Sequence, residues 1–107
     1  MSAPTPENAT KRRIRLMLKQ LDLWYFMPVQ TGYGAATLDF LGCCRDCRAF
    51  AIEAKAWGEY PTPRQWATIQ HMAERGVLVF VCDDQGNGKA PKHTDLGSLK
   101  KALDRDN

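Results

Sequence analysis

The chain opens with a helical pattern of apolar residues. Apolar side chains recur three or four positions apart, at Ile14, Met17, Leu18 and Leu21. This spacing predicts a helix with one buried face. Thr5 and Pro6 favour a helix start, as the cap and the first helical residue. Glu7 lies seven positions before Ile14, so we expect it on the inward face at the leading end of the helix. Residues 1–4 are expected to form a flexible tail.

Shorter apolar segments follow, and their lengths and turn residues predict strands. They are WYFMPVQTGYG (24–34), TLDFLGCC (37–44) and CRAFAIEAK (47–55). The first reads as a strand followed by a glycine-containing loop. Arg45 and Asp46 form a plausible two-residue turn that would join the other two segments in a hairpin.

A second helix is predicted over PTPRQWATIQHMAERG (61–76). Thr62 and Gln65 have the spacing of a capping box, and Gly76 is a typical helix terminator. The apolar stripe of this helix is expected to contain Trp66, Ile69 and Ala73.

The last third of the chain contains a buried strand and a short helix. VLVFVC (77–82) is continuously apolar, which is typical of a strand covered on both faces. Residues 83–93 are expected to form a loop, and Leu96, Leu99 and Leu103 predict the final helix. The order of helices and strands indicates one α/β domain over residues 1–107, with a mixed central sheet of about four strands flanked by helices.

Composition narrows the class of protein only a little. The chain has 107 residues, 25% of them charged, and a formal net charge of +3. That excess permits a polyanionic partner without requiring one. No apolar stretch is long enough to span a membrane, and the first residues lack the apolar core of a signal peptide. We therefore expect a cytoplasmic protein whose four cysteines are reduced.

Two opposite charges stand in the stretch FAIEAKAWG (50–58), which begins inside the predicted strand 47–55. Glu53 and Lys55 are two positions apart, so both side chains should project from the same face of the strand. Burying such groups is costly unless they are paired or bind a ligand. Asp39 lies in similarly apolar surroundings on the preceding strand. A two-residue turn would place Asp39 opposite Ile52, so strand twist or a bulge at Gly42 is needed to bring Asp39 to Glu53.

Two neighbouring carboxylates with a nearby lysine suit metal-assisted hydrolysis of a phosphodiester. Carboxylate oxygens are the ligands that Mg²⁺ prefers. A lysine beside the ion can orient the attacking water and stabilise the charge that develops. Asp39, Glu53 and Lys55 are therefore candidate catalytic residues.

The order Asp, then Glu-x-Lys on a hairpin behind a leading helix resembles the PD-(D/E)XK nuclease superfamily. LDFLG and FAIEAK, followed by PTPRQ and VLVFV, resemble the small stand-alone VRR-NUC domains, the virus-type replication-repair nucleases common in bacteriophages. YFMPVQTGYG is also similar to phage members. Leu38 departs from the proline that many members have before the aspartate, and no helical insertion is evident.

The resemblance implies a restriction-endonuclease-like core and assigns roles to individual residues. Asp39 and Glu53 match the metal-binding acids, Lys55 matches the catalytic lysine, and the carbonyl of Ala54 would be a further ligand. Glu7 matches an acid on the first helix, and Gln65 matches a glutamine close to the active site. The implied activity is that of an endonuclease dependent on Mg²⁺ or Mn²⁺.

The resemblance further implies a dimer acting on branched DNA such as four-way junctions, in the cytoplasm of a phage-infected cell. A flap or duplex nuclease and a non-catalytic nucleic-acid-binding module are the alternatives. Several side chains could contact DNA, the basic ones through its phosphates and Tyr33 from a substrate-facing loop. They are Arg12, Arg13, Lys19, Tyr33 and Arg64.

Most of these residues also have a plain structural interpretation. Glu53 and Lys55 could form a simple surface ion pair. Glu7 could pair with Lys11, four residues further along the helix. Gln65 could serve the capping box alone. The basic residues of the first helix could form an ordinary solvated face.

The cysteines leave one more alternative. Cys44 and Cys47 have the spacing of metal ligands, and Cys43 and Cys82 could complete four sulfurs around a structural zinc ion. One such pair is a weak signal, since it straddles the predicted hairpin turn.

Overall fold

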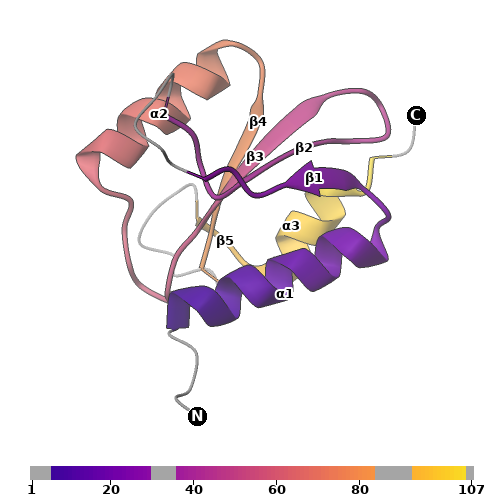
Figure 1. Cartoon of the computed structure of the whole chain (residues 1–107), viewed down its shortest axis with the longest axis horizontal. Helices are drawn as coiled ribbons and strands as arrows, with labels where there is room; N and C mark the ends of the chain where they lie inside the picture. The colour runs from indigo at the N-terminus through magenta and orange to yellow at the C-terminus, as the bar shows by residue number, and fades with distance from the viewer. Residues whose placement is uncertain (1–5, 30–35, 84–92, 106–107) are drawn as a thin grey trace.

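The computed structural model describes residues 6–29, 36–83 and 93–105. Its helices and strands follow the predicted order, with one short strand added (Figure 1). They are α1 (Pro6–Gln20), β1 (Trp24–Phe26), β2 (Phe40–Cys43), β3 (Ala49–Ala54), α2 (Pro63–Glu74), β4 (Leu78–Cys82), β5 (His93–Thr94) and α3 (Leu96–Leu103). The first helix begins at Pro6 as expected, whereas its predicted cap, Thr5, lies outside the described residues.

Within the described residues the sheet has five strands in the order β1-β2-β3-β4-β5. β1, β2 and β3 pair antiparallel, while β4 is parallel to both β3 and β5. The four expected strands and the mixed sheet are confirmed. His93, predicted to belong to a loop, instead pairs with Val81 as the start of the two-residue β5.

The sheet is covered by α1 and α3 on one face and by α2 on the other (Figure 1). Alternation along β3 sorts its side chains between these layers. Phe50 and Ile52 join the core beneath α1 and α3, while Ala51 joins the smaller core beneath α2. β4 alternates in the same way, so the prediction that this strand is covered on both faces is confirmed.

Helix α2 has the capping box that the sequence predicts. The Thr62 hydroxyl accepts a hydrogen bond from the Gln65 N–H at 3.2 Å, and the Gln65 side-chain oxygen accepts one from the Thr62 N–H at 2.9 Å. The predicted apolar stripe is wrong at one position. Ala73 is exposed, and Met72, three residues after the buried Ile69, packs against the core in its place.

Gly76 ends α2 in a left-handed conformation, with φ of +89°. The Gly76 N–H bonds to the Ala73 carbonyl and the Val77 N–H to the Met72 carbonyl, which is the Schellman arrangement. We expect Gly76→Ala to lower the free energy of unfolding by about 1 kcal/mol, because alanine is strained at this φ. Urea denaturation measures the change.

Gly97 is the matched control for that substitution. It lies in the first turn of α3 without a positive φ, and an added Cβ would meet its nearest neighbour at 3.6 Å, an ordinary contact. Gly97→Ala should therefore be neutral or slightly stabilising, because alanine has the higher helix propensity. Equal losses in both variants would contradict the assignment of Gly76 as a conformational stop.

The hairpin between β2 and β3 corrects the predicted register. Phe40 pairs with Ile52 and Cys43 with Ala49, so the loop has three central residues, 45–47, rather than two. Cys47 takes a left-handed φ of +69°, as the third residue of such loops does. The predicted turn at Arg45 and Asp46 is therefore one residue too short.

Candidate active site

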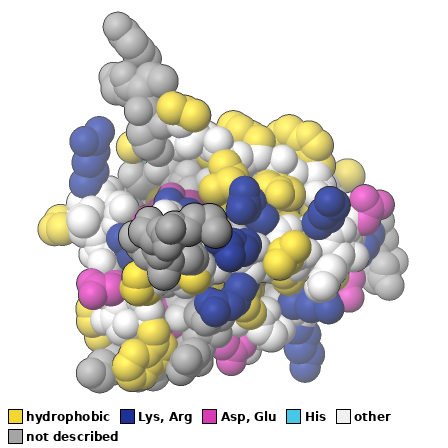
Figure 2. Space-filling view, turned by 60° about the horizontal axis from the view of Figure 1, so that its bottom comes forward, with side chains coloured by type: hydrophobic (Ala, Val, Ile, Leu, Met, Phe, Trp, Pro, Cys, Tyr) yellow, Lys and Arg dark blue, Asp and Glu magenta, His cyan; other side chains and the backbone are white. Residues whose placement is uncertain are grey.

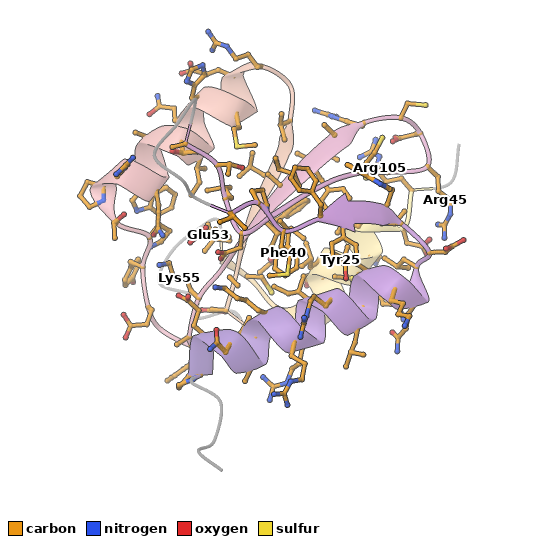
Figure 3. The ribbon with its side chains drawn as sticks, in the orientation of Figure 1. Tyr25, Phe40, Arg45, Glu53, Lys55 and Arg105 are labelled. Carbon is orange, nitrogen blue, oxygen red and sulfur yellow. The ribbon has the colours of Figure 1, made fainter. Side chains whose placement is uncertain are left out.

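Five charged side chains gather where β3 ends. Glu7 and Lys11 come from the first turns of α1, Asp39 from the bend before β2, and Glu53 and Lys55 from the end of β3. Figure 3 shows Glu53 and Lys55 at this end of the sheet, close to the start of α1. We call these five residues the charged cluster.

Glu53 and Lys55 project from the same face of β3, as predicted. The Lys55 ammonium lies 3.8 Å from a Glu53 carboxylate oxygen. Both side chains are buried, with only 5% of the Glu53 side chain and 11% of the Lys55 side chain exposed. The alternative of an exposed surface pair is therefore wrong.

The three-residue loop brings Asp39 to Glu53 without the bulge at Gly42 that the shorter loop would need. Since Phe40 pairs with Ile52, the residue before it falls beside Glu53. The Asp39 carboxylate accepts a hydrogen bond from the Ala54 N–H at 2.9 Å, which fixes it at the end of β3. Gly42 keeps regular pairing, and it is glycine because a Cβ there would lie 2.3 Å from the Phe50 ring.

The charges of the cluster alternate in sign. The Lys11 ammonium lies 3.5 Å from one oxygen of Glu7 and 3.6 Å from Asp39. The Lys55 ammonium lies 3.8 Å from the other oxygen of Glu7. The order in space is therefore Asp39, Lys11, Glu7, Lys55 and Glu53. Three carboxylates and two ammonium groups leave a net charge of −1 when all are ionised.

Glu53 is the member of the charged cluster whose ionised form is disfavoured. Burial, and then the negative charge of Asp39, raise its pKa to about 7, with a smaller contribution from Glu7 and partial relief from Lys55. Burial lowers the pKa of Lys11, but the charges of Asp39 and Glu7 more than compensate, so its pKa lies above the ordinary value. The site thus has more negative charge than its two lysines neutralise.

The donor atoms of the cluster fit a hard divalent cation. Three carboxylates supply oxygen alone, which Mg²⁺ and Mn²⁺ accept. Burial, and then the repulsion from Asp39, raise the pKa of Glu53, and a bound cation would favour its ionised form. Across residues 6–29, 36–83 and 93–105, however, no three Asp, Glu, His or Cys side chains are already arranged to hold a metal ion. In the charged cluster the two lysines stand between the three acids.

The four cysteines do not form a zinc site. Cys43 pairs with Ala49 and Cys82 with Ala54, so the two lie about 17 Å apart along the sheet. All four thiols are free. Burial, and then the charge of Asp46, raise the pKa of Cys44, which disfavours the thiolate that a metal would need. The zinc alternative is therefore wrong.

The arginines of α1 and Lys19 divide between two shallow depressions. Arg12 and Lys19 share one of about 200 Å³ with Arg15 and Tyr25. Arg13 lines a different one, beside Lys100 of α3. Figure 2, which brings α1 toward the viewer, shows Lys and Arg side chains gathered across this face. Arg15 was missed from sequence, although its spacing from Arg12 and Lys19 places all three on one stripe.

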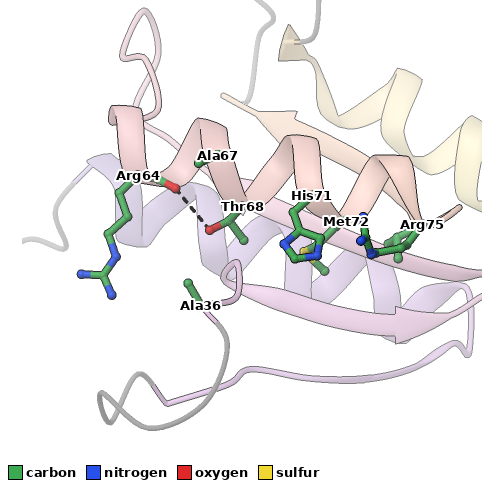
Figure 4. A pocket seen from close by; sticks show the side chains of 8 residues that line it. Ala36, Arg64, Ala67, Thr68, His71, Met72 and Arg75 are labelled. Atoms are coloured by element: carbon green, nitrogen blue, oxygen red, sulfur yellow. Dashed lines mark hydrogen bonds between the residues drawn. The ribbon is translucent and has the colours of Figure 1, made fainter.

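Arg64 lies on a third surface. It lines a groove of about 550 Å³ along α2, together with His71 and Arg75 (Figure 4). Their spacing puts the three on one face of the helix, and about 16 Å separates Arg64 from Arg75. Ala36 forms the facing wall. Tyr33 lies outside the described residues.

Comparison with known proteins adds one finding. No family model and no curated protein matches the sequence. The solved structure of a VRR_NUC domain matches with a TM-score of 0.68, over 95% of this chain and 98% of that one, at 16% sequence identity. The chain therefore has a restriction-endonuclease-like α/β fold. Within that class its fold is that of a VRR_NUC domain, as the sequence resemblance predicts.

Proposed function

We propose that the protein is a VRR-NUC-type DNA endonuclease dependent on Mg²⁺ or Mn²⁺. The observation that carries the proposal is the convergence of Asp39, Glu53 and Lys55 at the end of β3. Asp39 directly precedes β2, Glu53 belongs to β3 and Lys55 directly follows it, in a chain that has the fold of a VRR_NUC domain. Glu53 and Lys55 are buried and Asp39 is partly buried beside them. Such an arrangement of charges costs stability, and charged groups with perturbed pKa values cluster at functional sites.

Asp39 and Glu53 would hold the metal ion, with Glu7 and the Ala54 carbonyl completing the protein ligands. The bound ion would lower the pKa of a water molecule and polarise the scissile phosphate. Lys55 would orient the attacking water from its position beside Glu53. The oxygen of the attacking water would bond to phosphorus and lose a proton, while the bond from phosphorus to the 3′ oxygen breaks. The 3′ oxygen would take up a proton. The products would be a 5′-phosphate and a 3′-hydroxyl.

Gln65 has a structural role that does not exclude a catalytic one. Its side-chain oxygen is engaged by the Thr62 N–H. Its amide nitrogen belongs to the same side chain at the N-terminus of α2, the helix that follows the Glu-x-Lys strand. We propose that this amide assists at the active site.

The proposed substrate is branched DNA, and the proposed assembly is a homodimer. Trp24 and Phe26 are 66% and 45% exposed on β1, a strand at the edge of the sheet, with ring centroids 5.6 Å apart. A second copy would cover this apolar pair.

None of the helices in the described ranges is long and apolar enough to cross a bilayer. We propose the cytoplasm of a phage-infected cell as the place of action.

A cleavage panel tests the proposed function. Four-way junction, flap, single-stranded and duplex DNA are each incubated with the protein in Mg²⁺, in Mn²⁺ and in EDTA. The expected result is metal-dependent cleavage with preference for the junction. Preference for flap or duplex would favour the other nuclease alternative. Binding without cleavage by folded protein would favour a non-catalytic module. The basic stripe on α1, formed by Arg12, Arg15 and Lys19, would be enough to bind DNA phosphates in that case.

The basic stripe should make DNA binding salt-dependent. Removing one phosphate contact should reduce the slope of log affinity against log salt by about 0.9. We expect this for Lys19→Gln, measured by fluorescence anisotropy in Ca²⁺ between low and moderate salt. Lys101→Gln is the control, because Lys101 is an exposed lysine of α3 outside both depressions on α1. Equal slopes for the two variants would remove Lys19 from the DNA contact.

A further inference from the structure

Lys11 belongs to the charged cluster, but the proposed mechanism gives it no role. Its ammonium stands between Glu7 and Asp39, at 3.5 Å and 3.6 Å. The two acids belong to different segments, one to α1 and the other to the bend before β2. Only 25% of the Lys11 side chain is exposed. An ordinary helix-surface pair with Glu7 would need neither Asp39 nor this degree of burial.

The oxygens that Lys11 faces are those a metal ion would need. One oxygen of Asp39 accepts the Ala54 N–H, and Lys11 faces the other. One oxygen of Glu7 faces Lys55, and Lys11 faces the other. A divalent cation that used both acids would therefore have to share them with the Lys11 ammonium or displace it.

We infer that Lys11 is the built-in counter-cation of the acidic site, which holds Glu7 and Asp39 together before a divalent ion binds and yields them to that ion. The inference rests on the proposed function. Lys55 is less suited to this exchange, because it is more deeply buried and bridges Glu7 and Glu53. Lys11 lies on the more open side, and its four-carbon stem can carry the ammonium away from the acids.

Competition between Lys11 and the metal ion has opposite effects on the two states of the protein. Without metal, loss of the Lys11 charge changes the net charge of the cluster from −1 to −2, so repulsion among the acids grows. With metal, the same loss removes the competing cation and increases attraction for the ion. A lysine with a purely structural role would instead lower metal affinity when removed, because the ligands would lose their positions.

Manganese binding to the protein without DNA tests the inference. Electron paramagnetic resonance of free Mn²⁺ gives the dissociation constant for wild type, Lys11→Met and Lys11→Arg. We expect Lys11→Met to bind Mn²⁺ on the order of tenfold more tightly, because one nearby positive charge is gone. Lys11→Arg keeps the charge and should stay within about threefold of wild type. Lys11→Gln repeats the neutral substitution if the methionine variant does not fold.

Lys101→Met is the matched control, since it removes the same charge from an exposed position of α3, outside the charged cluster. Its Mn²⁺ affinity should equal that of wild type. Equal or weaker binding by folded Lys11→Met or Lys11→Gln would overturn the inference while leaving the proposed function in place. If wild type bound no Mn²⁺ and Asp39→Asn behaved identically, both would be overturned.

Discussion

Asparagine in place of Asp39 is expected to reduce the rate of DNA cleavage by on the order of 10³-fold or more. The substitution removes one negative charge from the proposed metal site. The asparagine oxygen can still accept the Ala54 N–H, so the local structure at the end of β3 should persist. Single-turnover cleavage of a labelled four-way junction in Mg²⁺ measures the loss, and circular dichroism verifies the fold.

Lys55→Met should cause a comparable loss by a different route. It removes the group proposed to orient the attacking water, while Asp39 and Glu53 remain to hold the metal ion. Mn²⁺ binding should therefore survive in Lys55→Met and be weakened in Asp39→Asn.

Asp104→Asn is the control for the charge change in Asp39→Asn. Asp104 is exposed, lies near the C-terminus and pairs with Arg45, outside the charged cluster. Cleavage by folded Asp39→Asn at the rate of Asp104→Asn would show that the acid does not serve catalysis.

The strands and helices could be predicted because their local signals agree with the tertiary structure. Three local signals each favour one conformation, and all three conformations are present in the structure. The signals are the capping box at Thr62, the helix end at Gly76 and the continuous apolar run of β4. β5 gave no such signal. Two residues are too few to show a period, and its position depends on pairing with β4 rather than on its own sequence.

The register of the β2–β3 hairpin could not be fixed by counting. A two-residue and a three-residue loop differ by one position in every pair, and without glycine the sequence does not choose between them. Cys47 adopts a left-handed conformation that its residue type does not suggest. That single residue decides whether Asp39 lies beside Glu53 or one step away.

The sequence predicts that the acids and the Glu-x-Lys pair lie near one another. It does not predict that acids and lysines alternate in the charged cluster. Sequence spacing can place Glu53 and Lys55 on one face of a strand. It cannot show that Lys11 reaches Asp39, because that contact depends on how the first turns of α1 cross the end of the sheet. The i, i+4 pair of Glu7 and Lys11 was visible in the sequence, yet its third partner was not.

The charged cluster also makes a prediction about stability, which requires no metal and no DNA. Glu53→Gln should raise the free energy of unfolding at pH 8 by up to about 3 kcal/mol in EDTA, and by little at pH 5. Glutamine resembles the protonated acid in shape and carries no charge. It removes the penalty of burying an ionised group beside Asp39 while leaving Lys55 its contact with Glu7.

The sign follows from the pKa of Glu53 in the two states. The folded-state pKa of about 7 lies above the unfolded value of 4.5, so between these two pH values the folded protein binds more protons. The free energy of unfolding contributed by this group is therefore greatest at low pH. It falls as pH rises from about 4.5 to about 7, and it stays low above that range.

Urea denaturation between pH 5 and pH 8 measures this dependence for wild type and Glu53→Gln. The difference between the two proteins should grow across that range and then level off. Glu74→Gln, at a 59% exposed side chain of α2, is the control and should run parallel to wild type. A Glu53→Gln protein that is less stable than wild type at pH 8 would mean that the ion pair with Lys55 outweighs burial and the repulsion from Asp39. Glu53 would then be a stabilising residue, and its burial would no longer indicate that the fold keeps a costly acid for binding a metal ion.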